Sequence, residues 1–94
     1  MGTKPRQRPE RLPGKLLQIR EAFGLSQSEM LKRLEADDLI VYNEISKYEL
    51  GLREPSLLVL LQYARVAGVC PELLIDDELD LPAKLPAKPK HTRR

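Results

Sequence analysis

The stretch GLSQSEM, residues 24–30, marks the junction between two helices. Gly24 suits the left-handed backbone position that ends a preceding helix. Ser26 and Glu29 have the spacing of a capping box, in which the serine hydroxyl accepts from the third helical amide and the glutamate accepts from the serine amide. We therefore predict that one helix ends at Gly24 and that a second begins after Ser26.

Apolar residues recur at helical spacing on both sides of this junction. Upstream, Leu16, Ile19 and Phe23 lie at positions i, i+3 and i+7. Pro13 suits the first turn of that helix, because an amide donor is not needed there. The second helix has the apolar positions Met30, Leu31 and Leu34, and the run 36–38 is expected to end it.

Three further helices are expected downstream. Residues 42–50 place Ile45 and Tyr48 on one face, and a glycine follows the segment. Residues 57–67 are apolar on most sides, which is typical of the central helix of a bundle. Residues 71–75 form a short fifth helix. Five helices with short connections and no strand pattern predict a compact all-α domain.

The composition suits a single domain without catalytic chemistry. The chain has 94 residues, 41% of them hydrophobic, and lacks an apolar run long enough for a membrane span. Cys70 is the one cysteine, expected as a small buried or capping residue, and the one histidine, His91, lies near the C-terminus. We expect a cytoplasmic protein that is not an enzyme and has no metal, cofactor or small-molecule site.

Charge is distributed unevenly along the chain. Residues 1–15 carry a net charge of +4, residues 82–94 carry +5, and the segment between them carries −7. Prolines recur in both terminal stretches and disfavour helices there. We expect a flexible basic arm over residues 1–11, a folded domain over 12–76, and an acidic-then-basic, Pro-rich disordered tail over 77–94.

GLSQSEM, followed by ISKYELGLREPSLLVLLQYARVAGVCPELL from residue 45, resembles the helix-turn-helix of the Cro and phage-repressor type, also called the xenobiotic-response-element family. The resemblance covers residues 12–75. It implies a lambda-repressor-like fold and a sequence-specific, DNA-binding transcriptional regulator, repressor-like and of prokaryotic or phage type. Such proteins commonly bind double-stranded DNA as dimers on half-sites about one turn apart. Here the candidate homodimer surface is Val69, Leu73 and Leu74, which equally suit the core.

The resemblance also implies roles for individual residues. In this family the second helix crosses the DNA backbone and the third enters the major groove. Asn43 has the donor and acceptor pair that matches adenine, and Lys47 can reach guanine or a phosphate. The expected DNA-binding residues are Gln27, Tyr42, Asn43, Ser46, Lys47 and Arg53, with Gln27 and Arg53 on phosphates. Arg20 and Glu49 are the expected structural ion pair between the first and third helices.

Two features depart from the family pattern. Leu31 stands where the family has a small residue, and Glu35 stands where it commonly has a glycine. The turn over residues 35–42 is also about four residues longer than usual. Its apolar residues 39–41 either extend the core or form a patch for a partner. This leaves the start of the third helix, and with it the roles of Tyr42 and Asn43, open by a residue or two.

Two alternatives remain open at this point. The polar residues on the third helix also suit an ordinary solvated face, and the body is acidic. If these residues form a solvated face, the chain is a protein-interaction module or an antitoxin-type regulator with weak or no DNA binding. The basic arms either supply DNA affinity through phosphate contacts or serve solubility alone.

Overall fold

The computed structural model describes residues 8–35 and 42–85, apart from the side chain of Tyr42. Within these ranges the chain forms helices and no strands, as predicted. The helices are α1 (Leu12–Ala22), α2 (Gln27–Arg33), α3 (Tyr42–Leu50), α4 (Leu57–Ala67) and α5 (Pro71–Ile75). The predicted all-α fold is therefore confirmed. The expectations for residues 1–7, 36–41 and 86–94, and for the Tyr42 side chain, lie outside the described residues.

The junction between α1 and α2 has the predicted geometry. The Ser26 hydroxyl accepts from the amide of Glu29 at 3.1 Å, and the Ser26 amide donates to the Glu29 carboxylate at 2.7 Å. The hydrogen bond from the Ser26 amide lowers the pKa of the Glu29 carboxyl group. The capping box thus fixes the first residue of α2.

The end of α2 lies earlier than predicted. The helix stops at Arg33, and Glu35 has a φ of +56°, in the left-handed region. Glu35 therefore adopts the conformation that glycine adopts most easily, and it does so despite its side chain. The Gln62 side chain of α4 donates to the Leu34 carbonyl at 3.0 Å, which satisfies one of the carbonyl groups left over at this helix end.

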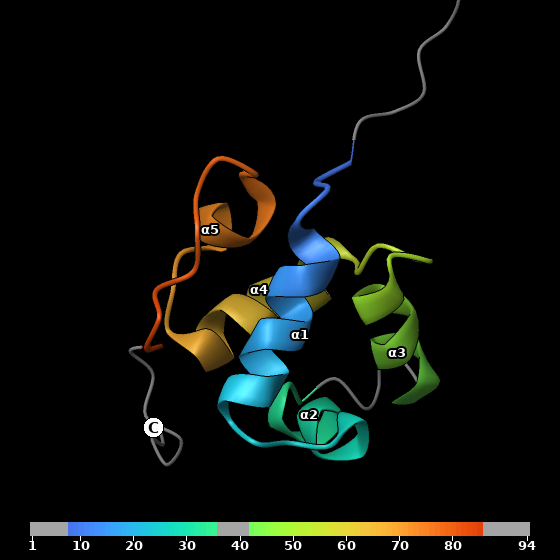
Figure 1. Cartoon of the computed structure of the whole chain (residues 1–94). Helices are drawn as coiled ribbons and strands as arrows, with labels where there is room; N and C mark the ends of the chain where they lie inside the picture. The colour runs from blue at the N-terminus through green and yellow to red at the C-terminus, as the bar shows by residue number, and fades with distance from the viewer. Residues whose placement is uncertain (1–7, 36–41, 86–94) are drawn as a thin grey trace, which may run out of the picture.

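The core is formed by one apolar face from each helix. Ten of its side chains are fully buried, namely Leu16, Ile19, Met30, Leu34, Ile45, Val59, Tyr63, Ala64, Ala67 and Leu74. α1 packs against α3, α4 and α5, and Figure 1 shows it in the middle of the molecule. The expectation that α4 is the central helix is wrong for its first turn, where Leu57 is 83% exposed and Leu58 is 62% exposed.

The candidate homodimer surface is not an exposed apolar patch. Leu74 belongs to the core, while Val69 and Leu73 pack against that core and are partly buried. Cys70 is exposed at the N-cap position of α5, where its side chain makes no capping hydrogen bond. No helix in the described part of the chain is long and apolar enough to span a membrane.

The N-terminus of α1 is capped by a residue from the other end of the chain. Arg11 at the N-cap position makes no side-chain cap. Instead, the Asp77 carboxylate accepts from the amides of Glu10 and Arg11 at 2.9 and 3.0 Å. The Arg11 guanidinium in turn bonds to the Asp77 carbonyl and to the Asp80 carboxylate. This clasp satisfies amide groups that α1 cannot satisfy internally.

Lys15 makes the reciprocal contact at the end of α5. Its ammonium group donates to the carbonyls of Leu73 and Asp76 at 2.6 and 2.9 Å, and the residue is only 3% exposed. Leu81, beyond the clasp, is also buried. The domain therefore extends past residue 76, and residues 77–85 are not the disordered tail that we expected. Arg11 and Lys15, which we counted with the basic N-terminal stretch, hold the fold together.

Candidate functional site

The candidate site is built on an ion pair that joins α1 to α3. Arg20 donates through Nε and Nη2 to the two carboxylate oxygens of Glu49, at 2.7 and 3.0 Å. Its Nη1 donates to the carbonyl of Leu25 at 2.9 Å, in the turn before α2. The Glu49 side chain is only 5% exposed. Because the pair is bidentate and nearly buried, it fixes the rotation of α3 about its own axis.

Gln27, the first residue of α2, joins this network. Its side-chain amide donates to Glu49 at 3.2 Å, and the residue is partly buried. The hydrogen bonds that the Arg20 guanidinium donates to the Glu49 carboxylate also raise the pKa of the guanidinium, which stays charged. Gln27 therefore has a structural contact that the sequence analysis did not anticipate. Only the part of the Gln27 side-chain amide that is not bonded to Glu49 can contact a DNA phosphate.

The network sets which face of α3 points outward. Ile45 and Tyr48 are buried against the core, as predicted. Asn43 is exposed on the opposite side, while Ser46 and Lys47 are partly exposed at its edges. We name these three residues the α3 outer face.

Leu50 also lies on this side of α3, and the sequence analysis missed it. It is 69% exposed, and it lies seven residues after Asn43, a spacing that places the two side chains on one line along the helix. That spacing was the available signal. An exposed leucine in this position can make apolar contacts with a ligand surface, in addition to the polar contacts of Asn43.

Glu44 on α3 was not among the expected DNA-binding residues. Its carboxylate pairs with Lys47 at 3.5 Å and with Arg53 at 3.2 Å. The structure therefore brings together two of the predicted cationic residues, one on α3 and one in the loop before α4. The i, i+3 spacing of Glu44 and Lys47 was a signal for the first pair. Nothing in the local sequence indicated the second.

The acidic segment after α5 lies away from this face. Figure 1 shows α3 and α5 on opposite sides of α1. The carboxylates of Asp77 and Asp80 are also engaged with the start of α1. The carboxylates of Asp77 and Asp80 therefore do not surround the α3 outer face.

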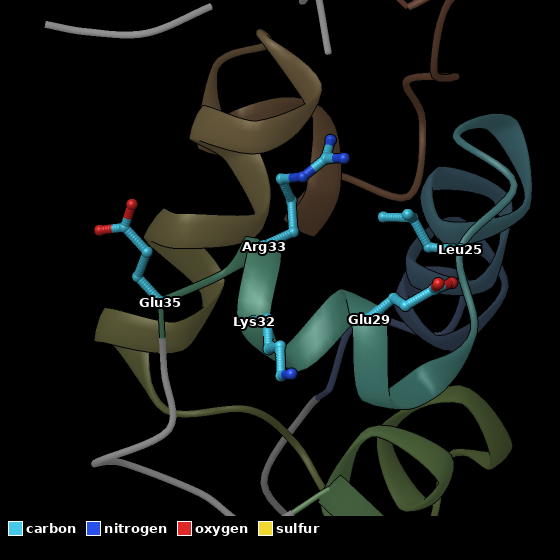
Figure 2. Close-up of a pocket in the computed structure, with 5 residues that line it drawn as sticks. All are labelled: Leu25, Glu29, Lys32, Arg33 and Glu35. Atoms are coloured by element: carbon cyan, nitrogen blue, oxygen red, sulfur yellow. The ribbon is translucent and has the colours of Figure 1, made fainter. Parts of the chain in front are cut away.

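A shallow hollow beside α2 is a poor candidate for a ligand site. It is lined by Leu25, Glu29, Lys32, Arg33 and Glu35. Figure 2 shows that these side chains point in different directions and do not converge on one point. Glu29 belongs to the capping box, and Arg33 lies over the Phe23 ring, 5.9 Å from its centre.

Comparison with known proteins gives a match at the family level. The model of one family, described as helix-turn-helix, matches residues 16–74, more than half of the chain. The matched region begins within α1 and ends within α5, so it includes the ion pair and the whole α3 outer face. No curated protein and no solved structure matches.

Proposed function

The chain belongs to the helix-turn-helix family, and from this premise we propose that it is a sequence-specific transcriptional regulator that reads the DNA major groove with α3. The family match supports a DNA-binding regulator of the Cro and phage-repressor type, a class that is not typically enzymatic. We further propose that it acts as a repressor, as a homodimer on two half-sites, in the cytoplasm where such DNA is held.

The observation that carries this proposal is the fixed orientation of α3. Arg20, Gln27 and Glu49 join the first three helices around one nearly buried carboxylate. A reading helix must present the same side chains to the base edges at each encounter, because base recognition depends on the geometry of paired donors and acceptors. A helix held by this network and by the core meets that requirement.

Each predicted DNA-binding residue then has a proposed role. Asn43 pairs with an adenine edge, and Ser46 bonds to a neighbouring base or sugar. Lys47 contacts guanine or phosphate, while Arg53 and Gln27 contact phosphates of the backbone. Tyr42 remains a proposed contact from the sequence alone. Leu50 is added here as an apolar contact for a thymine methyl group.

The basic terminal segments are proposed to supply part of the DNA affinity. Phosphate neutralisation dominates affinity for DNA, and the body between the arms is acidic. Because Arg11 and Lys15 are engaged within the domain, the N-terminal contribution falls to Lys4, Arg6 and Arg8. Arg8 is exposed just before the clasp.

Selection of bound duplexes from a random DNA pool tests the proposal. We expect a recovered motif with two related half-sites about one helical turn apart. Binding to the recovered duplex should exceed binding to a scrambled duplex of equal length at moderate salt. Recovery of sequences with no common motif would contradict sequence-specific regulation.

A second candidate function is favoured by one observation. Leu52, Leu57 and Leu58 are each more than 60% exposed around the connection between α3 and α4. Exposed apolar side chains in one region are typical of protein interfaces. The chain would then act as an interaction module or antitoxin with weak DNA binding. In that case the selection recovers no motif, and substitution of Leu57 and Leu58 by Gln abolishes partner binding.

A further inference from the structure

We propose that Glu44 is a positioning residue of the DNA-binding surface, which holds Lys47 and Arg53 together and increases the preference for one DNA sequence over others. This inference rests on the proposed function. It concerns a carboxylate that, by its charge alone, should weaken binding to any phosphate backbone.

The geometry places one cation on each oxygen of the Glu44 carboxylate. Lys47 Nζ lies 3.5 Å from Oε2, and Arg53 Nε lies 3.2 Å from Oε1. The first contact lies within α3, and the second reaches from the loop that follows it. Glu44 therefore connects two segments whose relative position would otherwise depend on a flexible arginine side chain.

The turn after α3 brings Arg53 within reach of this carboxylate. Gly51 has a φ of +79°, and the amide of Leu52 donates to the Lys47 carbonyl at 2.9 Å. These are the features of a helix end that reverses the chain direction. A side chain at Gly51 would meet Pro13 at 3.4 Å and would strain the backbone. The chain thus turns back beside α3, where Arg53 contacts Glu44.

The Glu44 side chain is less exposed to solvent than the two cationic side chains that it contacts. The Glu44 side chain is 16% exposed, whereas those of Lys47 and Arg53 are 42% and 60% exposed. Arg53 uses its Nε for Glu44, so the N–H groups of its two terminal nitrogens are the donors that can meet a phosphate in a fixed plane. The ammonium group of Lys47 likewise has more than one donor.

A purely stabilising role explains these contacts poorly. Ion pairs as exposed as these contribute little to stability, and α3 is already held by its core residues and by Glu49. The Glu44 charge reduces attraction to every phosphate backbone alike. Lys47 and Arg53, held in position by Glu44, reach their DNA contacts only on a sequence whose bases also fit the α3 outer face. The combined result is a higher ratio of specific to non-specific binding.

The experiment compares the full-length Glu44→Gln variant with a matched control, Glu21→Gln. Glu21 is exposed on α1, so this control makes the same change in net charge away from α3. Affinities are measured for the duplex recovered by selection and for a scrambled duplex, over a range of salt concentrations. We expect Glu44→Gln to bind the scrambled duplex more tightly and to lower the specificity ratio about threefold to tenfold. Glu21→Gln should leave this ratio unchanged.

A second variant, Arg53→Lys, tests the positioning role without changing charge. Lysine lacks the planar fork, so we expect a similar fall in the ratio, and Glu44→Gln should add little to it in the double variant. Thermal unfolding of each variant checks that the fold is retained. Equal ratios for Glu44→Gln and Glu21→Gln, or an unchanged ratio for Arg53→Lys, would overturn the role of Glu44. A wild-type protein that prefers no sequence would instead contradict the proposed function.

Discussion

At the scale of single residues, Lys15 is unusual because a cation is buried and bonded only to backbone carbonyls of α5 and its end. Burial, followed by the neighbouring Arg11 guanidinium, lowers the pKa of the Lys15 ammonium, and the nearby carboxylates of Asp76, Asp77 and Asp80 oppose this change. The group is tolerated because its donors meet the carbonyls that a helix end leaves unsatisfied.

Substitution of Lys15 by Met should therefore destabilise the fold. The methionine fills a similar volume, but it leaves the carbonyls of Leu73 and Asp76 without their donor. We expect a loss of about 1–3 kcal/mol in the free energy of unfolding, measured by urea denaturation. Lys32→Met, at an exposed position on α2, is the matched control and should change stability little. Equal stability of Lys15→Met and wild type would show that these bonds contribute nothing.

Glu35 offers the opposite case, a residue whose replacement should stabilise the fold. Its φ of +56° costs an L-residue about 1–2 kcal/mol, which glycine avoids. We expect Glu35→Gly to raise the free energy of unfolding by about 0.5–1 kcal/mol. Glu21→Gly, within α1, should lower it by about 1 kcal/mol. A lower melting temperature for Glu35→Gly would contradict the left-handed conformation.

Site residues were predictable to the extent that they depend on local pattern. The outward placement of Asn43 and Lys47 on α3 followed from helical periodicity combined with the family resemblance, whereas Glu44 was not among the expected contacts. The contact of Glu44 with Arg53 depends on the reversal at Gly51, which brings loop and helix together in space. Likewise, the contact of Gln27 with Glu49 joins residues on different helices. Neither contact has a signature in the spacing of residues along the chain.

At the scale of elements, the start of α1 depends on the segment after α5. The amides of Arg11 and Glu10 donate to the Asp77 carboxylate and lower its pKa below the ordinary value of 3.8. A carboxyl group with a lowered pKa in the folded state stabilises the fold above its unfolded pKa. That contribution is lost as the pH falls through the folded value.

Asp77→Asn should accordingly flatten the acid limb of the stability profile. We expect the melting temperature of wild type to fall below about pH 4, and that of Asp77→Asn to fall less steeply over the same range. Glu29 shifts in the same direction, so part of the acid dependence should remain in the variant. Parallel profiles for the two proteins would show that the Asp77 cap does not couple to folding.

Apart from the end of α2, the helices were well predicted, because their ends have local causes. Glycines at 24, 51 and 68, the capping box at Ser26 and the proline near the start of α5 all act within a few residues. The clasp was not predicted, since Asp77 lies 66 residues from Arg11 in sequence. Sequence composition alone assigned this acidic run to a disordered tail.

At the scale of the whole molecule, the C-terminal segment to residue 85 belongs to the folded domain. Leu81 is 7% exposed, and Leu85 packs against the core. A chain ending at residue 85 should match the full-length protein in urea unfolding. A chain ending at residue 76 should lose about 2–3 kcal/mol from the burial of Leu81 alone. Equal stability of the two truncated chains would place the C-terminal boundary of the folded domain at residue 76, as the sequence analysis predicted.

The central claim is that the α3 outer face reads base edges, and Asn43 tests it most directly. The measurement is the affinity of full-length Asn43→Ala for the selected duplex and for duplexes changed one base pair at a time. We expect a loss of about 1–3 kcal/mol and a relaxed preference at one adenine, while Gln18→Ala, exposed on α1, binds like wild type. An Asn43→Ala variant with unchanged affinity and unchanged base preference would contradict the account.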